Sequence, residues 1–304
     1  MAPPADSTSL ANRPAILFQV FGTREAPRMV PVATIDMGVG RLRPIVLDSA
    51  GWRALDSMYL RRDSRYTLYQ DGSPRGTARV VRGMWEQGSD PVYRLDGCRT
   101  ELPVALVSLE TPRKQGLAIE LLASSAELGW ARSTPPIDMP GLTAVAQELA
   151  RKAGEKVEIG GSAVDSLDFR AVAFQSQKGA EPTLVSQWLD SAASSGASPS
   201  ARARHIFIIA DRAPSGAYVA SFLHRVNGPL EEAEFRRYID HLDLDGDGVD
   251  EIVTEVWRFR GDTWISVLDF DGSRWYEVLR APTTWCLDAK SRGAEREAPA
   301  KPAP

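Results

Sequence analysis

The C-terminal half of the chain alternates short runs of β-branched and aromatic residues with turn-forming residues, and this pattern constrains the fold most. Turns such as Asn227-Gly228-Pro229 and Asp271-Gly272-Ser273 are typical of tight connections between neighbouring strands. The spacing predicts an antiparallel meander. We expect a hairpin at residues 169–174 and 184–189, and then strands at residues 205–211, 218–226, 234–240, 252–259, 264–269 and 275–280. Residues 234–242 also fit one face of a helix, so both interpretations stay open there.

The N-terminal half carries the same signature without a recognisable chemical motif. Gln70-Asp71-Gly72-Ser73 is a hairpin-type turn between two of its predicted strands. This half is therefore expected to form a β-rich domain of unknown function at residues 15–130. Its predicted strands lie at residues 16–21, 30–35, 66–69, 77–81, 92–95, 104–109 and 117–122.

One packing helix is predicted after the prolines at positions 135, 136 and 140. Apolar residues recur there at helical spacing, and Gly154 stands just past the expected helix end: Leu142, Val145, Ala146, Leu149, Ala150 and Ala153. The fold class is then mostly β, with an N-terminal β-rich domain, one packing helix and a C-terminal antiparallel meander. The expected divisions are a flexible lead at 1–14, the first domain at 15–130, a helix plus antiparallel β domain at 135–289 and a disordered tail at 290–304, with a flexible loop at 191–201.

Charge and hydropathy weigh against two kinds of interaction. The 304 residues include 36 Lys and Arg against 40 Asp and Glu, a net charge of −4, whereas nucleic-acid partners usually need a basic face. Apolar runs such as residues 206–210 are far shorter than the roughly 20 residues of a membrane-spanning helix. The first 14 residues lack the apolar segment of a signal peptide. The protein is either cytosolic or the chain lacks its leader, and the sequence does not decide between these.

One segment carries chemistry, namely residues 243–251, which hold five carboxylates among nine residues. Without a cation these negative charges would repel one another. Carboxylates at loop positions 1, 3 and 5, from Asp243, Asp245 and Asp247, can converge on one centre. The carbonyl of Val249 and the carboxylate of Glu251 can add ligands at positions 7 and 9. Oxygen ligands in a flexible loop favour Ca²⁺ over a transition metal, although such a stretch can also be only a polar turn.

An EF-hand does not explain this segment. Position 8 should be apolar but is Asp250, and position 12 should be glutamate but is Thr254. The residues that follow, Ile252 and Val253 among them, are typical of a strand rather than of the exit helix of an EF-hand.

The segment instead resembles the calcium loop of FG-GAP/VCBS-type repeats, in which D-x-[DN]-G-D-G-x-x-[DE] leads into a strand. The resemblance implies a Ca²⁺ cofactor held by Asp243, Asp245, Asp247, Glu251 and the carbonyl of Val249. Family members often form propellers with several such loops, but this chain has one full copy. Asp269-Phe270-Asp271-Gly272 begins like a second copy and then departs at Arg274. We therefore do not expect a full propeller.

Two further features keep alternatives open. Cys98 and Cys286 are either two separate thiols or one long-range disulfide, and the latter would indicate an oxidising compartment. The C-terminal aromatic residues either fill a core or form an exposed platform for a sugar or peptide. These aromatic residues are Trp257, Phe259, Trp264, Trp275, Tyr276 and Trp285.

These observations favour a non-catalytic, calcium-stabilised β protein with a binding or structural role and an unidentified protein or carbohydrate partner. The family resemblance favours the bacterial cell envelope, with the protein periplasmic or extracellular. The alternative is a hydrolase with its active site in the N-terminal half and a C-terminal accessory binding module. A pocket with an acid or base of perturbed pKa in residues 15–130 would favour the hydrolase, and a filled core there would favour the first hypothesis.

Overall fold

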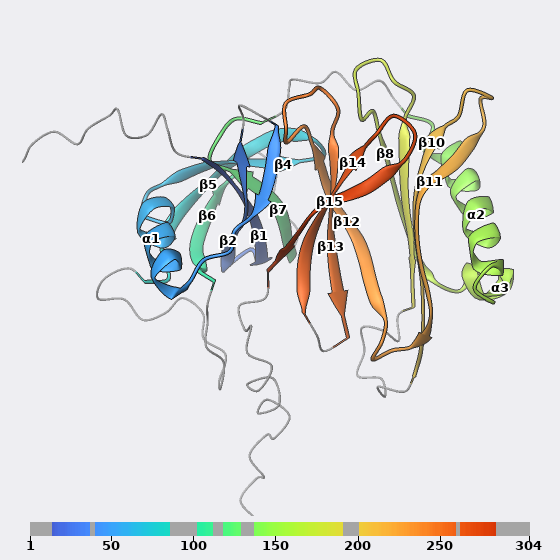
Figure 1. The fold of residues 1–304 in the computed structure, drawn as a ribbon, viewed down its shortest axis with the longest axis horizontal. Coiled ribbons are helices and arrows are strands. Elements are labelled where there is room, and N and C mark those ends of the chain that lie inside the picture. Colours follow the sequence, from blue (N-terminus) through green and yellow to red (C-terminus); the bar gives the residue numbers. More distant parts are fainter. Residues whose placement is uncertain are drawn as a thin grey trace, which may run out of the picture.

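The computed structural model describes residues 14–36, 40–85, 102–111, 118–128, 137–190, 201–259 and 262–283. Within them the prediction of a mostly β fold with antiparallel sheets is confirmed. The elements stack in layers: a barrel, a four-stranded sheet, a second four-stranded sheet, and helices on its outer face (Figure 1). No described helix is long and apolar enough to cross a membrane. The strand predicted at residues 92–95 lies outside the described residues.

The N-terminal strands close into a barrel. They follow the order β1-β7-β4-β5-β6-β2-β3, and β1 also pairs with β2, so that six strands form a ring and β3 extends it beside β2. Buried side chains from all six ring strands fill the interior, among them Phe18, Met29 and Leu68. The strands are β1 (Ala15–Thr23), β2 (Pro27–Asp36), β3 (Arg41–Pro44), β4 (Arg65–Gln70), β5 (Ser73–Arg82), β6 (Ala105–Glu110) and β7 (Ala118–Ser124).

Helix α1 (Ser49–Tyr59) packs against this barrel core and is not among the elements expected from the sequence. Its Trp52, Leu55 and Tyr59 are buried and have helical spacing. The carboxylate of Asp48 accepts the Gly51 N–H at 2.7 Å and so caps the first turn. The helix is short and lies between segments of strand character, which explains why periodicity alone did not reveal it.

The C-terminal strands form two four-stranded sheets, so the expected meander is divided in two. One sheet has the order β11-β10-β9-β8 and the other the order β12-β13-β14-β15. Residues 234–242 form a strand, which excludes the helix interpretation, since Phe235 pairs with Trp257. The strands are β8 (Asp168–Phe174), β9 (Thr183–Leu189), β10 (Arg202–Arg212), β11 (Tyr218–Pro229), β12 (Glu234–Leu242), β13 (Glu251–Arg258), β14 (Thr263–Phe270) and β15 (Trp275–Pro282).

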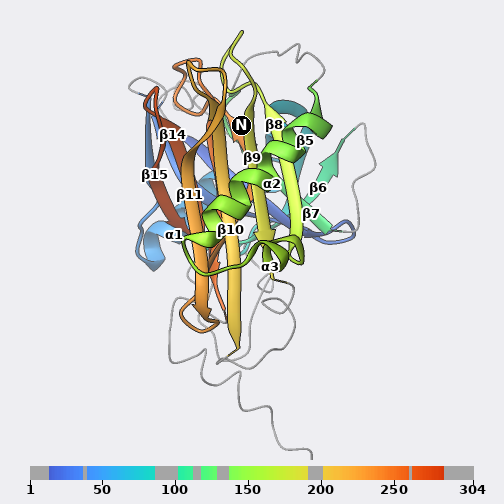
Figure 2. The same ribbon diagram turned by 90° about the vertical axis from the view of Figure 1, so that its right-hand side faces the viewer.

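Helices α2 (Met139–Glu155) and α3 (Gly161–Asp165) cover the outer face of the β8–β11 sheet (Figure 2). Helix α2 is the predicted helix, but Gly154 lies within it rather than beyond its end. A Cβ atom at Gly154 would lie 2.9 Å from both the Ile159 carbonyl oxygen and a methyl group of Val164. The glycine therefore allows the chain that leads into α3 to pack closely against α2, and it does not mark a helix end.

Three apolar layers hold the stack together. One lies between α2 and the β8–β11 sheet, and a second lies between the two sheets. The third, here called the junction core, joins the barrel to the β12–β15 sheet. It combines Leu17, Val32, Ile35, Tyr69 and Leu122 from the N-terminal half with Leu242, Leu244, Val253, Ile265 and Val267 from the C-terminal half. The two halves thus share a core, and the domain boundary near residue 130 stays a prediction because residues 129–136 lie outside the described ranges.

The turn between β4 and β5 makes a polar contact at this junction. The backbone N–H of Gly72 donates to Oδ1 of Asp240 on β12 at 2.9 Å. Gly72 has φ of +67°, and a Cβ atom there would lie 2.4 Å from Nε2 of His241. The contact therefore depends on glycine for both its backbone conformation and its lack of a side chain.

We expect Gly72→Ala to lower the free energy of unfolding by about 2–4 kcal/mol, because it adds left-handed strain and a steric clash. Urea denaturation of the two proteins measures this difference. Gly179→Ala is the control, since Gly179 also has positive φ but meets nothing within 4 Å. Equal losses in the two variants would show that backbone strain alone is responsible and that the junction contact contributes nothing.

His205 on β10 joins the two sheets as a neutral imidazole. It is fully buried, its Nδ1 donates to the Trp188 carbonyl at 2.9 Å, and its Nε2 accepts the Arg236 N–H of β12 at 3.1 Å. Burial, together with the positive charges of His224 and Arg236, lowers the pKa of His205 from 6.5 to about 3. Protonating Nε2 would remove the acceptor that holds β12.

This histidine should make the protein less stable in mild acid. The unfolded chain binds a proton at His205 below pH 6.5, whereas the folded protein does so only near pH 3, so stability falls as pH drops from 6.5 towards 3. From this group alone we expect a loss of about 2 kcal/mol between pH 7.5 and pH 5. Urea denaturation at both pH values measures it. An identical pH dependence in His205→Gln would contradict the assignment.

Candidate metal centre

The acidic loop connects β12 to β13 and is held by apolar packing as well as by hydrogen bonds. Leu244, in its middle, is fully buried in the junction core. On the other side, the Asp250 N–H donates to the Ser176 carbonyl at 2.7 Å, and Val249 forms an isolated antiparallel bridge with Gln177. The loop therefore lies between the barrel and the β8–β9 connection.

The three aspartates predicted as ligands do converge. Asp243, Asp245 and Asp247 each offer a carboxylate oxygen, and these oxygens all lie within 4.8 Å of one another. The two oxygens of Asp243 accept the Gly246 N–H at 2.7 Å and the Gly248 N–H at 3.2 Å. Both glycines have positive φ, which gives the tight loop its shape. Hydrogen bonds of this kind also occur in plain polar turns, so the aspartates alone do not indicate a metal.

Glu251, at the start of β13, is the more informative residue. Its side chain is only 2% exposed, and its Oε2 accepts the Leu244 N–H at 2.6 Å, so the carboxylate folds back over the loop. Its Oε1 is buried and has no hydrogen-bond partner in the described structure. The pKa of Glu251 is raised to about 9, mainly by burial and also by the negative charges of Asp245, Asp269 and Asp243, while the Leu244 hydrogen bond opposes the shift.

Two of the five carboxylates, those of Asp250 and Glu251, point in opposite directions. Neighbouring residues on a strand point to opposite faces, so Asp250 and Glu251 are separated. Asp250 lies with Oδ2 3.7 Å from Nε2 of His241, whose ring stacks on Phe174 between the two sheets. Asp250 therefore belongs to a buried polar group with His241, and Glu251 belongs to the loop.

Asp269 is a further acidic residue near the loop, and the resemblance did not include it. It comes from β14, and its charge contributes to raising the pKa of both Glu251 and Asp245, although burial is the largest cause for each. Sequence proximity could not reveal it, because it lies 18 positions beyond Glu251. The antiparallel pairing of β13 with β14 brings the two together.

Cys98 and Cys286 lie outside the described residues, so the disulfide stays a prediction. The aromatic residues divide between the two interpretations. Trp275 is buried between the sheets, and Trp257 and Phe259 pack with Phe235. Tyr276 is exposed, and Trp285 lies outside the described residues. Trp264 is partly buried, with the Arg258 and Arg280 guanidinium groups over its ring. Three of the five described aromatic residues thus pack in or against a core, and only Trp275 is fully covered.

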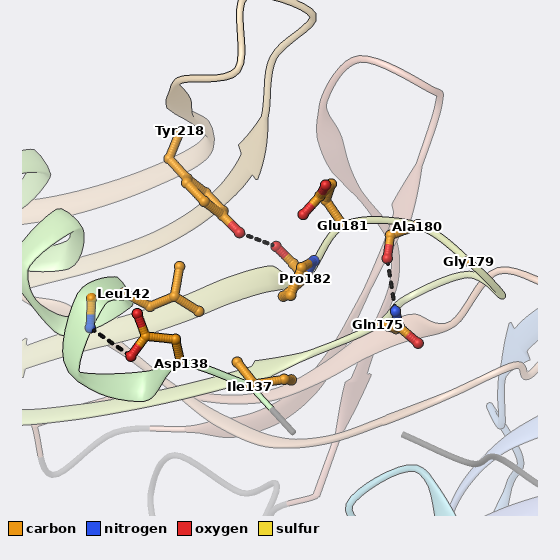
Figure 3. A pocket seen from close by; sticks show the side chains of 10 residues that line it. Ile137, Asp138, Leu142, Gln175, Gly179, Ala180, Glu181, Pro182 and Tyr218 are labelled. Atoms are coloured by element: carbon orange, nitrogen blue, oxygen red, sulfur yellow. Dashed lines mark hydrogen bonds between the residues drawn. The ribbon is translucent and has the colours of Figure 1, made fainter. Parts of the chain in front are cut away.

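A cavity of about 460 Å³ opens at the start of α2, beside the β8–β9 connection (Figure 3). Asp138 and Glu181 contribute carboxylates to its wall, and the Tyr218 hydroxyl donates to the Pro182 carbonyl at 3.0 Å. The same connection carries Ser176 and Gln177, which hold the acidic loop. The cavity and the loop thus share one supporting segment.

A smaller cavity of about 170 Å³ lies where β7 meets β8, β9 and β12, and it includes Glu120. Burial raises the pKa of Glu120, and the Arg237 guanidinium opposes this shift. Arg237 is ion-paired with both Glu120 and Glu255. The acid is on the outer face of the barrel, not in its filled interior. Glu120 is thus an acid of raised pKa in the N-terminal half, and it already forms an ion pair with Arg237.

Comparisons of the chain with family models, with curated proteins and with solved structures found no match. The FG-GAP/VCBS-type resemblance therefore rests on the residues of the loop alone.

Proposed function

We propose that this protein is a non-catalytic, calcium-stabilised β protein whose ion is held by the loop between β12 and β13. The observation that carries the proposal is Oε1 of Glu251, a buried carboxylate oxygen with no hydrogen-bond partner among the described residues. Glu251 closes the loop whose three aspartates converge, although its own oxygens are not part of that converging group. Burying a carboxylate without compensation is costly, and a cation offsets that cost. Asp243, Asp245, Asp247 and Glu251 would hold Ca²⁺, with the Val249 carbonyl as the further predicted ligand. The bound ion would supply positive charge.

The position of the loop supports a structural role. Leu244 is part of the junction core, and a Cβ atom at Gly40 of the barrel would lie 3.1 Å from the Asp245 carbonyl oxygen. An ion in the loop would therefore order residues that contact both the barrel and the C-terminal sheets. The resemblance to FG-GAP/VCBS-type loops supports a location in the bacterial cell envelope, where free Ca²⁺ is abundant enough for weak sites.

The hydrolase alternative has less support. The barrel interior is filled with apolar side chains, which favours the first hypothesis. Glu120 has a raised pKa, but its ion pair with Arg237 leaves a carboxylate that is held in place rather than positioned to transfer a proton.

Calcium should raise the melting temperature of the wild-type protein. A ligand that binds only the folded state at a hundredfold excess over Kd adds about 2.7 kcal/mol, which corresponds to a few degrees. Asp245→Ala should remove most of this shift, whereas Glu232→Ala, at an exposed acid between β11 and β12, should retain it. Differential scanning calorimetry with chelator and with millimolar Ca²⁺ measures the shift. Coincident wild-type curves would mean that the loop is only an acidic turn.

The site should prefer Ca²⁺ to Mg²⁺. Oxygen ligands on a flexible loop suit the larger ion, because Mg²⁺ demands near-octahedral geometry and loses its water reluctantly. Isothermal titration of chelator-treated protein with each ion gives the two dissociation constants. Equal or tighter binding of Mg²⁺ is the result that would refute the assignment.

A further inference from the structure

Glu251 and Asp269 face each other across two strands. In the pairing of β13 with β14, Ile252 is opposite Leu268 and Val253 is opposite Val267. Continuing this register by one residue places Glu251 opposite Asp269. Directly opposed residues of an antiparallel pair lie on the same face with Cβ atoms about 4.5–5.5 Å apart. Like charges in such a position destabilise a sheet.

The described residues provide no basic side chain to balance this pair. None of the ion pairs among the described residues involves Glu251 or Asp269. Within the described ranges, Asp269 receives two uncharged donors, namely the Tyr276 hydroxyl at 2.6 Å on Oδ2 and the Phe270 N–H at 2.6 Å on Oδ1. Each of its oxygens retains a lone pair. Glu251, at 2% exposure, retains its unpartnered Oε1.

We propose that Asp269 is a further ligand of the cation, supplied by β14, so that the ends of two neighbouring hairpins form the site. This inference rests on the proposed function, because it assigns a residue to the same ion. Tyr276 then acts as a positioning residue that orients the Asp269 carboxylate. The site is not a linear nine-residue loop but spans β12, β13 and β14.

The assignment also explains the segment Asp269-Phe270-Asp271-Gly272. The first aspartate serves the existing site rather than a second one. Asp271 instead shapes its own turn, since its Oδ1 accepts the N–H groups of Ser273 at 2.9 Å and Arg274 at 3.0 Å. The two aspartates are two residues apart on one hairpin and have different roles, which makes Asp271 a matched control.

Calorimetric titration with Ca²⁺ of wild type, Asp269→Asn and Asp271→Asn tests the proposal. We expect Asp269→Asn to raise the Kd about tenfold to hundredfold and Asp271→Asn to leave it within twofold. In chelator, Asp269→Asn should melt close to the wild-type temperature, because asparagine keeps the size of the side chain and one acceptor oxygen. If wild type binds Ca²⁺ and Asp269→Asn binds equally well, the inference fails while the proposed function stands. If wild type does not bind, the proposed function itself fails.

A second measurement separates a ligand from a structural residue. Binding at Asp269 should alter the hydrogen bond of Tyr276 and so produce a Ca²⁺-dependent tyrosine absorbance difference that Tyr276→Phe lacks. Because Tyr276 is 41% exposed, this substitution leaves the core intact. Identical difference spectra for wild type and Tyr276→Phe would overturn the inference. So would an Asp269→Asn protein that melts below wild type in chelator as well as losing Ca²⁺ binding.

Discussion

The apolar contact between the barrel and the β12–β15 sheet determines how everything else in this protein is arranged. The sheet has two buried faces, one against the barrel and one against the β8–β11 sheet. The central strand β13 therefore carries one exposed side chain, Arg258, whereas the edge strand β15 keeps Tyr276, Glu277 and Arg280 exposed. Polar groups that remain inside the sheet need internal partners. Apolar burial of this extent is the main source of stability for such a stack. Apolar packing does not explain the polar groups inside this stack, and these groups need a separate account.

These buried polar groups are of two kinds. His205 has both ring nitrogens bonded to backbone groups, one in each sheet, and so links the two sheets. Arg236 bonds Thr254, Ser266 and Glu277 within the β12–β15 sheet, although its Nε has no hydrogen-bond partner among the described residues. Glu251 differs in kind, because its unpartnered atom is a carboxylate oxygen, which can accept a cation, whereas that of Arg236 is a donor. This difference supports the proposed role of Glu251 as a ligand.

The sequence predicted local features well, because strands and the acidic loop depend on neighbouring residues. β-branched runs and glycine-containing turns located nearly all the described strands, and carboxylates at positions 243, 245 and 247 predicted their own convergence. Features that depend on residues far apart were not predictable. Closure of the barrel needs β1 to pair with both β2 and β7, and the division into two sheets depends on packing between faces. Asp269 is missed for the same reason, since only strand register brings it to Glu251.

The alternation of side chains along the strand also explains why an ion here would stabilise the junction core and not the apolar layer between the two sheets. Asp250 points towards His241 and Phe174, between the two sheets, with its Oδ2 3.7 Å from Nε2 of His241. Glu251 points to the barrel face, on which Leu242 and Val253 belong to the junction core. The barrel has a separate filled core and does not need the ion for its own packing. A cation on the Glu251 side would therefore stabilise the attachment of the β12–β15 sheet to the barrel, and its loss would loosen that attachment before either core.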